Sequence, residues 1–383
     1  MFESSSIELS TAALKNNLKF IKKRMNKGVR YCSVIKGNAY GHGIPEFVKM
    51  AMSLGVDYFG VHSADEAYLL VKNAEIIPDV FIMGAIEGEA IEWAIKNNIE
   101  FAVFDFQRLD ETIKYANKLN TKAKIHIEIE TGMVRTGFDI AEIPVVCEIL
   151  NNNIENITFQ GLFTHFAGAE SEANHFRISK QIESFKIARQ LFKAQDLTPI
   201  YHHTSCSAAL INYPETQGNM VRIGILQYGF WPNKETHIKF CGDRANTPIL
   251  LKRIIKWKTN VMAIKEIKRG NFIGYGTSYL SLKNMRLAVI PVGYSHGYSR
   301  NLSNVGSVLI QGKVSKVVGI VNMNSLTVSI TNTAKITKGD EVVLIGKQND
   351  KSISIYSFSE QSNQLNYELL TRLPLNIPRV IVK

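Results

Sequence analysis

The sequence predicts a TIM-type (β/α)8 barrel followed by a mainly β domain. Eight short apolar segments alternate with helical patterns over roughly the first 225 residues, which matches the strand count and length of such a barrel. The alternation stops after Trp231, where strand-like segments joined by short turns take over. A chain of 383 residues is also longer than one hydrophobic core usually supports, so two domains are expected.

The predicted barrel strands are short runs rich in apolar and β-branched residues. Ser63–Glu66 forms a capping box for the helix after the second strand, and residues 174–194 form a long amphipathic helix. A doubly wound open sheet is the alternative, but it rarely sustains eight units, and no GxGxxG or Walker pattern supports it. The eight segments are Tyr31–Lys36, Asp57–His62, Asp79–Gly84, Ile99–Asp105, Lys124–Glu130, Thr158–His165, Ile200–Ser205 and Met220–Ile225.

The second domain is expected to be built mainly of strands, with one helical pattern at Ser357–Leu370. The short strand Ile7–Leu9 has no place in the barrel, so we expect it to pair with the β domain. The predicted division is therefore an N-terminal strand in residues 1–10, a barrel in 11–235 and a β domain in 236–383. The strand-like segments are Ile249–Lys268, Arg286–Tyr294, Gly306–Ile330, Glu341–Gly346 and Ile377–Val382.

Composition and charge exclude several classes of protein. The net charge is +11, but the lysines are dispersed and no basic run contains interleaved aromatics, so nucleic-acid binding is not expected. The N-terminal segment lacks the basic and apolar regions of a signal peptide, and no apolar window is long enough to span a membrane. The four cysteines are widely spaced without a CxxC pair, which is typical of reduced thiols in a cytoplasmic protein.

Lys36 is the first candidate for chemistry, because it ends an apolar segment, Tyr31–Ile35, and precedes Gly37. An ammonium group at the end of a buried strand loses water, which lowers its pKa. A lysine of this kind forms a Schiff base with an aldehyde. A lone lysine at a strand end more often only reaches solvent, so this interpretation depends on the residues that accompany it.

Other polar residues are expected near Lys36, at the carboxyl ends of the predicted strands. In a TIM barrel these ends form the active site, and phosphate is often bound after strands seven and eight. A phosphate-bearing aldehyde that reacts with Lys36 describes pyridoxal 5′-phosphate (PLP). The residues expected at this mouth are Lys36, Tyr40, Glu128, Arg135, His165, Ser205, Cys206, Ser207, Arg222, Gly224 and Ile225.

The sequence closely resembles the alanine racemases, PLP enzymes with a barrel domain followed by a β domain. The match extends through both domains in the family's order, which makes it far more specific than any single motif. Its segments are Val34–Gly43, Thr131–Gly137, Thr164–Phe166, Ser205–Ala209, Val221–Gly229, Gly274–Gly276, Val292–Tyr294, Val321–Asn324 and Asn366–Glu368.

The resemblance implies interconversion of L-alanine and D-alanine, which supplies D-alanine for peptidoglycan. Lys36 would hold PLP and act as one acid/base group, and Tyr275 of a second subunit would act as the other. His165 is the family's partner to that phenol, and Arg222 donates to the pyridine nitrogen of PLP. Because arginine keeps its proton, that nitrogen would stay unprotonated and the ring would be a weaker electron sink.

The resemblance also implies how the cofactor and substrate are held. The phosphate of PLP would contact Tyr40, Ser207, Tyr367 and the backbone of Gly224 and Ile225. Arg135 would face the phenolate oxygen of PLP and the substrate carboxylate, which is a charge-assisted pair. Met323 and Tyr294 would close the substrate pocket from the partner subunit, so the enzyme would be a homodimer with shared sites.

Two positions depart from the family's common pattern. Many alanine racemases have a carbamylated lysine seven residues before the active-site arginine, and this chain has Glu128 there. Because glutamate supplies a fixed carboxylate, we expect no dependence on bicarbonate. The sequence Asn322-Met323-Asn324 stands where Cys-Met-Asp is common, which removes a charge near the substrate carboxylate. The preference for alanine over another small amino acid such as serine is therefore left open.

Other interpretations exist for the same residues. PLP-dependent decarboxylases of similar layout usually bind phosphate with consecutive glycines, and no Gly-Gly pair occurs in this chain. Taken singly, His165 is compatible with a core histidine, Tyr275 with a turn aromatic and Tyr367 with a packing residue. His202, His203 and Cys206 lack a fourth ligand at suitable spacing, so no metal site is expected.

Overall fold

The computed structural model describes residues 4–242, 250–330, 335–354 and 366–383. The chain divides into two compact units. The barrel unit comprises Ala13–Lys36 and Val48–Lys252, and the β unit comprises Met1–Ala12, Gly37–Phe47 and Arg253–Lys383. The predicted fold class, a (β/α)8 barrel followed by a mainly β domain, is confirmed.

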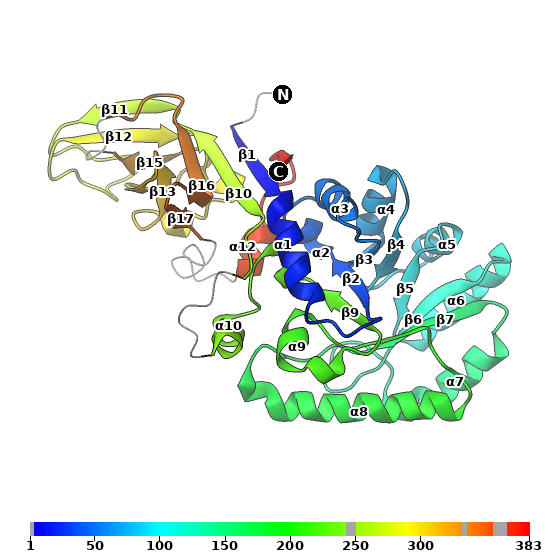
Figure 1. The fold of residues 1–383 in the computed structure, drawn as a ribbon. Coiled ribbons are helices and arrows are strands. Elements are labelled where there is room, and N and C mark those ends of the chain that lie inside the picture. Colours follow the sequence, from blue (N-terminus) through cyan, green and yellow to red (C-terminus); the bar gives the residue numbers. More distant parts are fainter. Residues whose placement is uncertain (1–3, 243–249, 331–334, 355–365) are drawn as a thin grey trace. The chain divides into compact units, whose positions relative to one another are not determined.

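The barrel unit contains a parallel sheet of eight strands in the order β8-β7-β6-β5-β4-β3-β2-β9 (Figure 1). The ring closes between its two ends through the backbone, because Arg222 N donates to Ser205 O at 2.9 Å and Asn219 N donates to His202 O at 3.2 Å. The strands are β2 (Arg30–Val34), β3 (Tyr58–Val61), β4 (Asp79–Ile82), β5 (Glu100–Val103), β6 (Ala123–Glu128), β7 (Ile157–Phe163), β8 (Tyr201–His203) and β9 (Met220–Ile223).

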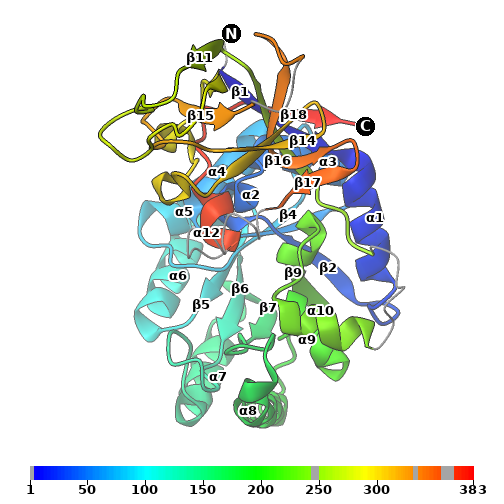
Figure 2. The ribbon, with the colours of Figure 1, turned by 90° about the vertical axis from the view of Figure 1, so that its left-hand side faces the viewer.

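These strands are buried on both faces, as expected of a parallel sheet covered by helices. Figures 1 and 2 show α4 to α8 on the outside of the strands. The helices are α1 (Thr11–Lys22), α3 (Ile44–Met52), α4 (Ala64–Asn73), α5 (Glu89–Lys96), α6 (Phe106–Leu119), α7 (Ile143–Asn152), α8 (His175–Ala194), α9 (Ser207–Asn212) and α10 (Lys234–Cys241), with 3-10 turns η1 (Ile140–Glu142), η2 (Glu172–Asn174), η3 (Pro214–Thr216) and η4 (Ile225–Tyr228). Within the described residues, no helix is both long enough and apolar enough to cross a bilayer.

The start of α4 differs in one detail from the predicted capping box. Ser63 is the N-cap, and its hydroxyl accepts from Glu66 N at 3.3 Å. The Glu66 carboxylate accepts from His62 N at 2.9 Å rather than from the N–H of Ser63. The reciprocal bond therefore lies one residue earlier, which ties the helix to the residue that directly follows β3.

The short element α2 (Lys36–Tyr40) is a left-handed turn, which the sequence pattern did not predict. Its residues from Gly37 to Tyr40 all have φ between 51° and 63°. Each L-residue in this conformation costs roughly 1–2 kcal/mol, so only surrounding contacts can maintain it. Gly41 N donates to Gly37 O at 2.9 Å, and Gly43 N donates to Asn38 O at 3.0 Å. These backbone bonds close the turn that directly follows Lys36.

The β unit contains two sheets. The larger has the order β14-β13-β16-β10-β1-β18 with β17 paired to β16, and the smaller has the order β11-β12-β15. The N-terminal strand β1 pairs antiparallel with β10 and parallel with β18. The elements are β1 (Ser5–Ser10), β10 (Ile255–Asn260), β11 (Ala263–Ile267), β12 (Met285–Ile290), η5 (Tyr294–His296), η6 (Arg300–Leu302), β13 (Ser307–Ile310), β14 (Lys313–Lys316), β15 (Leu326–Ser329), β16 (Glu341–Gln348), β17 (Lys351–Ile353), α12 (Asn366–Thr371) and β18 (Arg379–Val382).

Several predicted segments of the β unit are subdivided. Gly306–Ile330 contains three strands, because Gln311 and Gly312 form a hairpin turn with φ of 50° and 74° between β13 and β14. β17 was not predicted. For the expected helix at Ser357–Leu370, α12 covers its end, and residues 357–365 lie outside the described part of the chain, as does residue 249.

Candidate active site

Lys36 lies two residues beyond β2 at the carboxyl end of the barrel strands. The bond from Ile35 N to Gly60 O, 2.8 Å long, fixes the preceding residue against β3. The Lys36 side chain is exposed, in contrast to the expected desolvated ammonium. Its pKa is nevertheless lowered, first because nearby protein displaces water and then because Arg135 and Arg222 repel its charge.

Arg222 and His165 lie at the same mouth. Arg222 is buried on β9, where its guanidinium donates to Thr164 O at 2.8 Å and to His203 O at 2.7 Å. His165 follows β7 by two residues, and burial together with the charges of Arg222, Lys36 and Arg135 lowers its pKa to about 3. The histidine is therefore neutral at physiological pH and available as a hydrogen-bond partner rather than as a cation.

Arg135 is carried by a loop built around the carboxylate of Glu130. This carboxylate accepts the backbone N–H of Gly132, of Val134 at 2.7 Å and of Arg135 at 3.3 Å. Val134 is 84% exposed with φ of 56°, a strained conformation for a β-branched residue. The Glu130 bonds hold that conformation, so Glu130 determines where the chain presents Arg135. This role of Glu130 was not predicted; its only signal in the sequence is an acidic residue at the start of a tight glycine-containing loop.

Glu128, the last residue of β6, is buried near Arg135 and Arg222. Burial raises the pKa of its carboxyl, whereas the hydroxyl of Thr136, which donates to it at 2.8 Å, and the charge of Arg135 oppose that rise. A buried carboxyl group therefore occupies position 128, where the sequence predicted a fixed carboxylate in place of a carbamylated lysine.

Potential anion donors follow β8 and β9, at the starts of α9 and η4. Ser207 opens α9, and its hydroxyl oxygen accepts the N–H of Gly224 at 3.0 Å, which leaves its own proton available to a ligand. Ile225 opens η4, so its N–H has no acceptor within that turn. The buried hydroxyl of Ser205 has no hydrogen-bond partner among the residues that the structure describes. These donors suit an anionic group.

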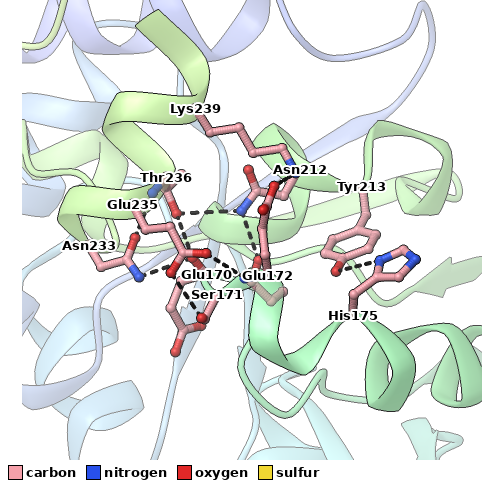
Figure 3. A network of polar contacts seen from close by, with 11 residues as sticks. Glu170, Ser171, Glu172, His175, Asn212, Tyr213, Asn233, Glu235, Thr236 and Lys239 are labelled. Carbon is pink, nitrogen blue, oxygen red and sulfur yellow. Dashed lines mark hydrogen bonds and ion pairs between the residues drawn. The ribbon is translucent and has the colours of Figure 1, made fainter. Parts of the chain in front are cut away.

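A polar network fastens the loop after β7 to α10 (Figure 3). Lys239 pairs with Glu172 at 2.8 Å, and the carboxylate of Glu235 accepts from Ser171 Oγ at 2.9 Å and from Glu172 N at 2.6 Å. Thr236 on the same helix donates to Glu170 O at 3.1 Å. The loop that begins at His165 is thus anchored at its far end.

The remaining predicted residues lie in the β unit. Tyr40 and Tyr367 have ring centroids 6.0 Å apart. Tyr275 is 74% exposed at the tip of a hairpin, between Gly274 and Gly276, which both have positive φ.

Met323 and Tyr294 are also exposed, at 56% and 41%. Near them, Asn324 Nδ2 donates to Ser295 Oγ at 2.9 Å, and that hydroxyl donates to Met323 O at 2.7 Å. The amide of Asn324 therefore has a local partner on η5, which holds the backbone of Met323.

Comparisons with known proteins cover both units. The model of the alanine racemase N-terminal domain matches residues 9–232, and the model of the C-terminal domain matches residues 254–381. Alanine racemase 1 of Caldanaerobacter subterraneus subsp. tengcongensis is 32% identical over 378 residues, covering 98% of this chain and 94% of that protein. The alanine racemase of Methanococcus maripaludis is 32% identical over 375 residues, 97% of each chain.

The chain belongs to the alanine racemase family. This family consists of PLP-dependent racemases, so the resemblance found in the sequence is confirmed. Among solved structures, the alanine racemase of Clostridium difficile 630 has a TM-score of 0.90 and 30% identity, and covers 100% of this chain and 96% of that one. A histidine racemase from Leuconostoc mesenteroides subsp. sake has a TM-score of 0.88 and 25% identity, covering 100% of this chain and 98% of that one.

The residues at the barrel mouth fit the family's cofactor. Lys36 supplies an amine with a lowered pKa, and Arg135 and Arg222 supply positive charge. The hydroxyl of Ser207 and the N–H of Ile225 supply neutral donors for a phosphate. A mouth with this charge balance accommodates an anionic aldehyde better than a neutral ligand.

Proposed function

We propose that this chain is a PLP-dependent alanine racemase that interconverts L-alanine and D-alanine by a two-base mechanism and so supplies D-alanine for peptidoglycan. The observation that carries the proposal is the cluster of Lys36, Arg135 and Arg222 around a neutral His165 at the barrel mouth. Full-length similarity to alanine racemases from several organisms supports the same reaction.

The proposed cofactor site consists of the residues that the family resemblance implies. Lys36 would attach PLP, and Arg222 would donate to its pyridine nitrogen, because arginine does not lose its proton. When bound, PLP withdraws electron density from the α-carbon of the amino acid joined to it. The residues that would hold the phosphate are Tyr40, Ser207, Gly224, Ile225 and Tyr367.

The proposed acid/base groups are Lys36 and Tyr275 of the partner subunit, on opposite faces of the α-carbon. Racemisation requires a proton to leave one face and another to arrive on the other, so two groups are needed. A free tyrosine is a weak base at neutral pH. His165 is uncharged there, so it can accept a hydrogen bond from the phenol and ease the loss of its proton.

We infer that the enzyme is a homodimer with two shared sites. Tyr275, Tyr294 and Met323 are all exposed in the single chain, and Phe272 and Leu280 beside Tyr275 are exposed as well. Phe272, Tyr275 and Leu280 are neighbours, and adjoining exposed apolar side chains are typical of a protein interface. The barrel in residues 11–235 would hold PLP, and the β domain in residues 236–383 would complete the partner's site.

Alanine is the proposed substrate, with Arg135 binding its carboxylate and Met323 and Tyr294 of the partner subunit limiting the pocket. We place the reaction in the cytoplasm, in agreement with four cysteines that are all free thiols.

The experiment is to incubate the PLP-loaded enzyme with L-alanine and separate the products on a chiral column. The proposal predicts an equal mixture of L- and D-alanine without release of CO₂. Ethylamine and CO₂ as products would establish a decarboxylase instead. Parallel assays with L-serine and L-histidine compare kcat/KM among side chains, and either exceeding alanine would overturn the proposed substrate.

A further inference from the structure

A row of ionisable side chains crosses the interior of the barrel beneath the candidate active site. Tyr58, Glu100, His126, His203 and Arg222 come from five strands, β3, β5, β6, β8 and β9, and all are buried. Burial of charged and polar groups is costly unless each finds a partner. The row therefore requires a physical explanation beyond core packing.

Consecutive members of the row are hydrogen-bonded. Arg222 Nη1 contacts His203 Nδ1, His203 Nε2 lies 2.9 Å from His126 Nδ1, and His126 Nε2 lies 2.8 Å from Glu100 Oε2. Three hydrogen bonds thus join the guanidinium of Arg222 to the carboxylate of Glu100. Both imidazoles use both ring nitrogens within the row, so neither has a nitrogen left for a metal ion.

Arg222 at one end and Glu100 at the other determine which ring nitrogen of His203 and of His126 carries the proton. Arginine can only donate, so His203 Nδ1 must accept and the proton of the neutral ring is on Nε2. That proton is donated to His126 Nδ1, which places the proton of His126 on Nε2, where it is donated to Glu100. Burial lowers the pKa of both histidines, so the neutral rings that this order requires are the favoured forms.

The Glu100 end is built to hold a negative charge. In addition to His126, the hydroxyl of Tyr58 donates to Oε2, and Gln160 Nε2 donates to Oε1 at 2.9 Å. Burial alone would raise the pKa of Glu100, but the bonds from His126 and Tyr58 outweigh it, so this pKa lies below its usual value. A carboxylate at one end and a guanidinium at the other are therefore linked through two neutral rings.

Aromatic side chains hold both rings in place. Phe163 stacks on His203 with centroids 5.1 Å apart and planes 4° apart, and Phe81 stacks on His126 with centroids 4.1 Å apart. Because the stacked rings cannot rotate freely, a ring that carries its proton on the other nitrogen cannot restore the hydrogen bonds of the row by flipping.

We propose that Glu100 is a positioning residue which, through His126 and His203, fixes the direction of hydrogen bonding and the orientation of the Arg222 guanidinium. Without the carboxylate, His126 has no anionic acceptor for its Nε2 proton and can place that proton on Nδ1 instead. The Nδ1 proton of His126 would then face the Nε2 proton of His203, so the hydrogen bond between the two rings could not form. His203 would no longer link His126 to Arg222. The consequence for PLP rests on the proposed function, because it requires Arg222 to face the pyridine nitrogen.

The test is to label histidine with ¹⁵N and record long-range ¹H–¹⁵N correlations, which distinguish Nδ1–H from Nε2–H tautomers. The wild-type protein should show both His126 and His203 as neutral Nε2–H tautomers. An Nδ1 proton on either ring would overturn the proposal, and this measurement needs no variant.

Glu100→Gln tests transmission along the row. We expect changed ¹⁵N shifts at His203, which does not touch Glu100. The matched control is Tyr58→Phe, which removes another bond to the same carboxylate but keeps its charge and its bond to His126; His203 should then be unchanged. An unchanged His203 in Glu100→Gln, or equal changes in both variants, would contradict the proposal.

Kinetics on the PLP-loaded enzyme provide a second readout. Glu100→Gln should lower kcat by roughly ten- to a hundredfold, with little change in the KM for alanine. The same loss is typical when a carboxylate that orients a histidine is removed in metalloenzymes. A wild-type kcat in Glu100→Gln would contradict the role of Glu100. Because the tautomers are measured without substrate, an inactive wild-type protein with both Nε2–H tautomers would refute the racemase proposal and leave the row intact.

Discussion

The imidazole Nδ1 of His42 lies 2.9 Å from the backbone carbonyl oxygen of Tyr40 and equally far from that of Ala39. Both carbonyls belong to the left-handed turn that directly follows Lys36. Burial lowers the pKa of His42 to about 4, so the ring donates as a neutral group. A residue outside the proposed chemistry thus stabilises a strained backbone beside Lys36, the proposed catalytic lysine.

His42→Ala should therefore destabilise the protein by about 1–3 kcal/mol, because the carbonyl of Tyr40 loses the imidazole as a donor, whereas the carbonyl of Ala39 keeps the backbone N–H of residue 42. We also expect weaker PLP binding, since the turn carries Tyr40 and follows Lys36. Urea unfolding and a PLP titration measure the two effects. His42→Asn, whose amide can still donate, should lose less than His42→Ala. Wild-type stability in the alanine variant would show that backbone bonds alone maintain the turn.

Glu128 should make the enzyme independent of bicarbonate. Its buried carboxyl group stands at the position where the family resemblance implies a carbamylated lysine in many members, so removing dissolved CO₂ should leave activity unchanged. Glu128→Gln keeps the shape but removes the charge that faces Arg135, so the KM for alanine should rise by about tenfold, which corresponds to the strength of one charge-assisted hydrogen bond. Recovery of a CO₂-depleted wild-type sample on addition of bicarbonate would disprove this assignment.

Four histidines with lowered pKa values predict a loss of stability in acid. His42, His126, His165 and His203 all have lowered pKa values in the folded chain, whereas each titrates near 6.5 when unfolded. The unfolded state therefore binds more protons below pH 6.5, and the free energy of unfolding falls as pH decreases. Each histidine contributes up to about a tenfold change in the folding equilibrium per pH unit. The raised pKa of Glu128 acts in the opposite sense.

Urea titrations at pH 7.5, 6.5 and 5.5 measure this dependence directly. A steep decrease between pH 6.5 and 5.5, with little change between 7.5 and 6.5, is the expected result. A flat profile across this range would show that these rings are charged in the folded protein.

Shared active sites predict complementation between two inactive variants. Lys36→Ala and Tyr275→Phe should each lower kcat by about 10²–10⁴-fold, because each removes one acid/base group. When equal amounts are unfolded together and refolded, the proposed dimer would give half hybrids with one native site each, which should restore about one quarter of wild-type activity. Refolded single variants are the control. Absence of recovery in a dimeric mixture would place Lys36 and Tyr275 of one site on the same chain.

Most of the barrel could be predicted from the sequence, because parallel strands buried on both faces appear as short apolar runs separated by helical patterns. Each observed strand overlaps its predicted segment, and the observed end lies one or two residues earlier. The polar residues at the strand ends followed from the same alternation, which is why Lys36, His165 and Arg222 were found.

The missed features depend on contacts that periodicity does not encode. The left-handed turn includes Ala39 and Tyr40, residues without a preference for positive φ, and it is held by His42. Glu100 and His126 lie within apolar strand segments, where the pattern gives no sign that they meet a histidine from β8. Such relationships arise only when the barrel closes.

The central claim, that two groups act on opposite faces of the α-carbon, is tested most directly by the isotope content of alanine at early times in D₂O. Starting from L-alanine, the two-base account predicts that the D-alanine formed carries deuterium at the α-carbon while most of the remaining L-alanine keeps protium. Equal deuterium in both enantiomers, or D-alanine that retains the original protium, would contradict it.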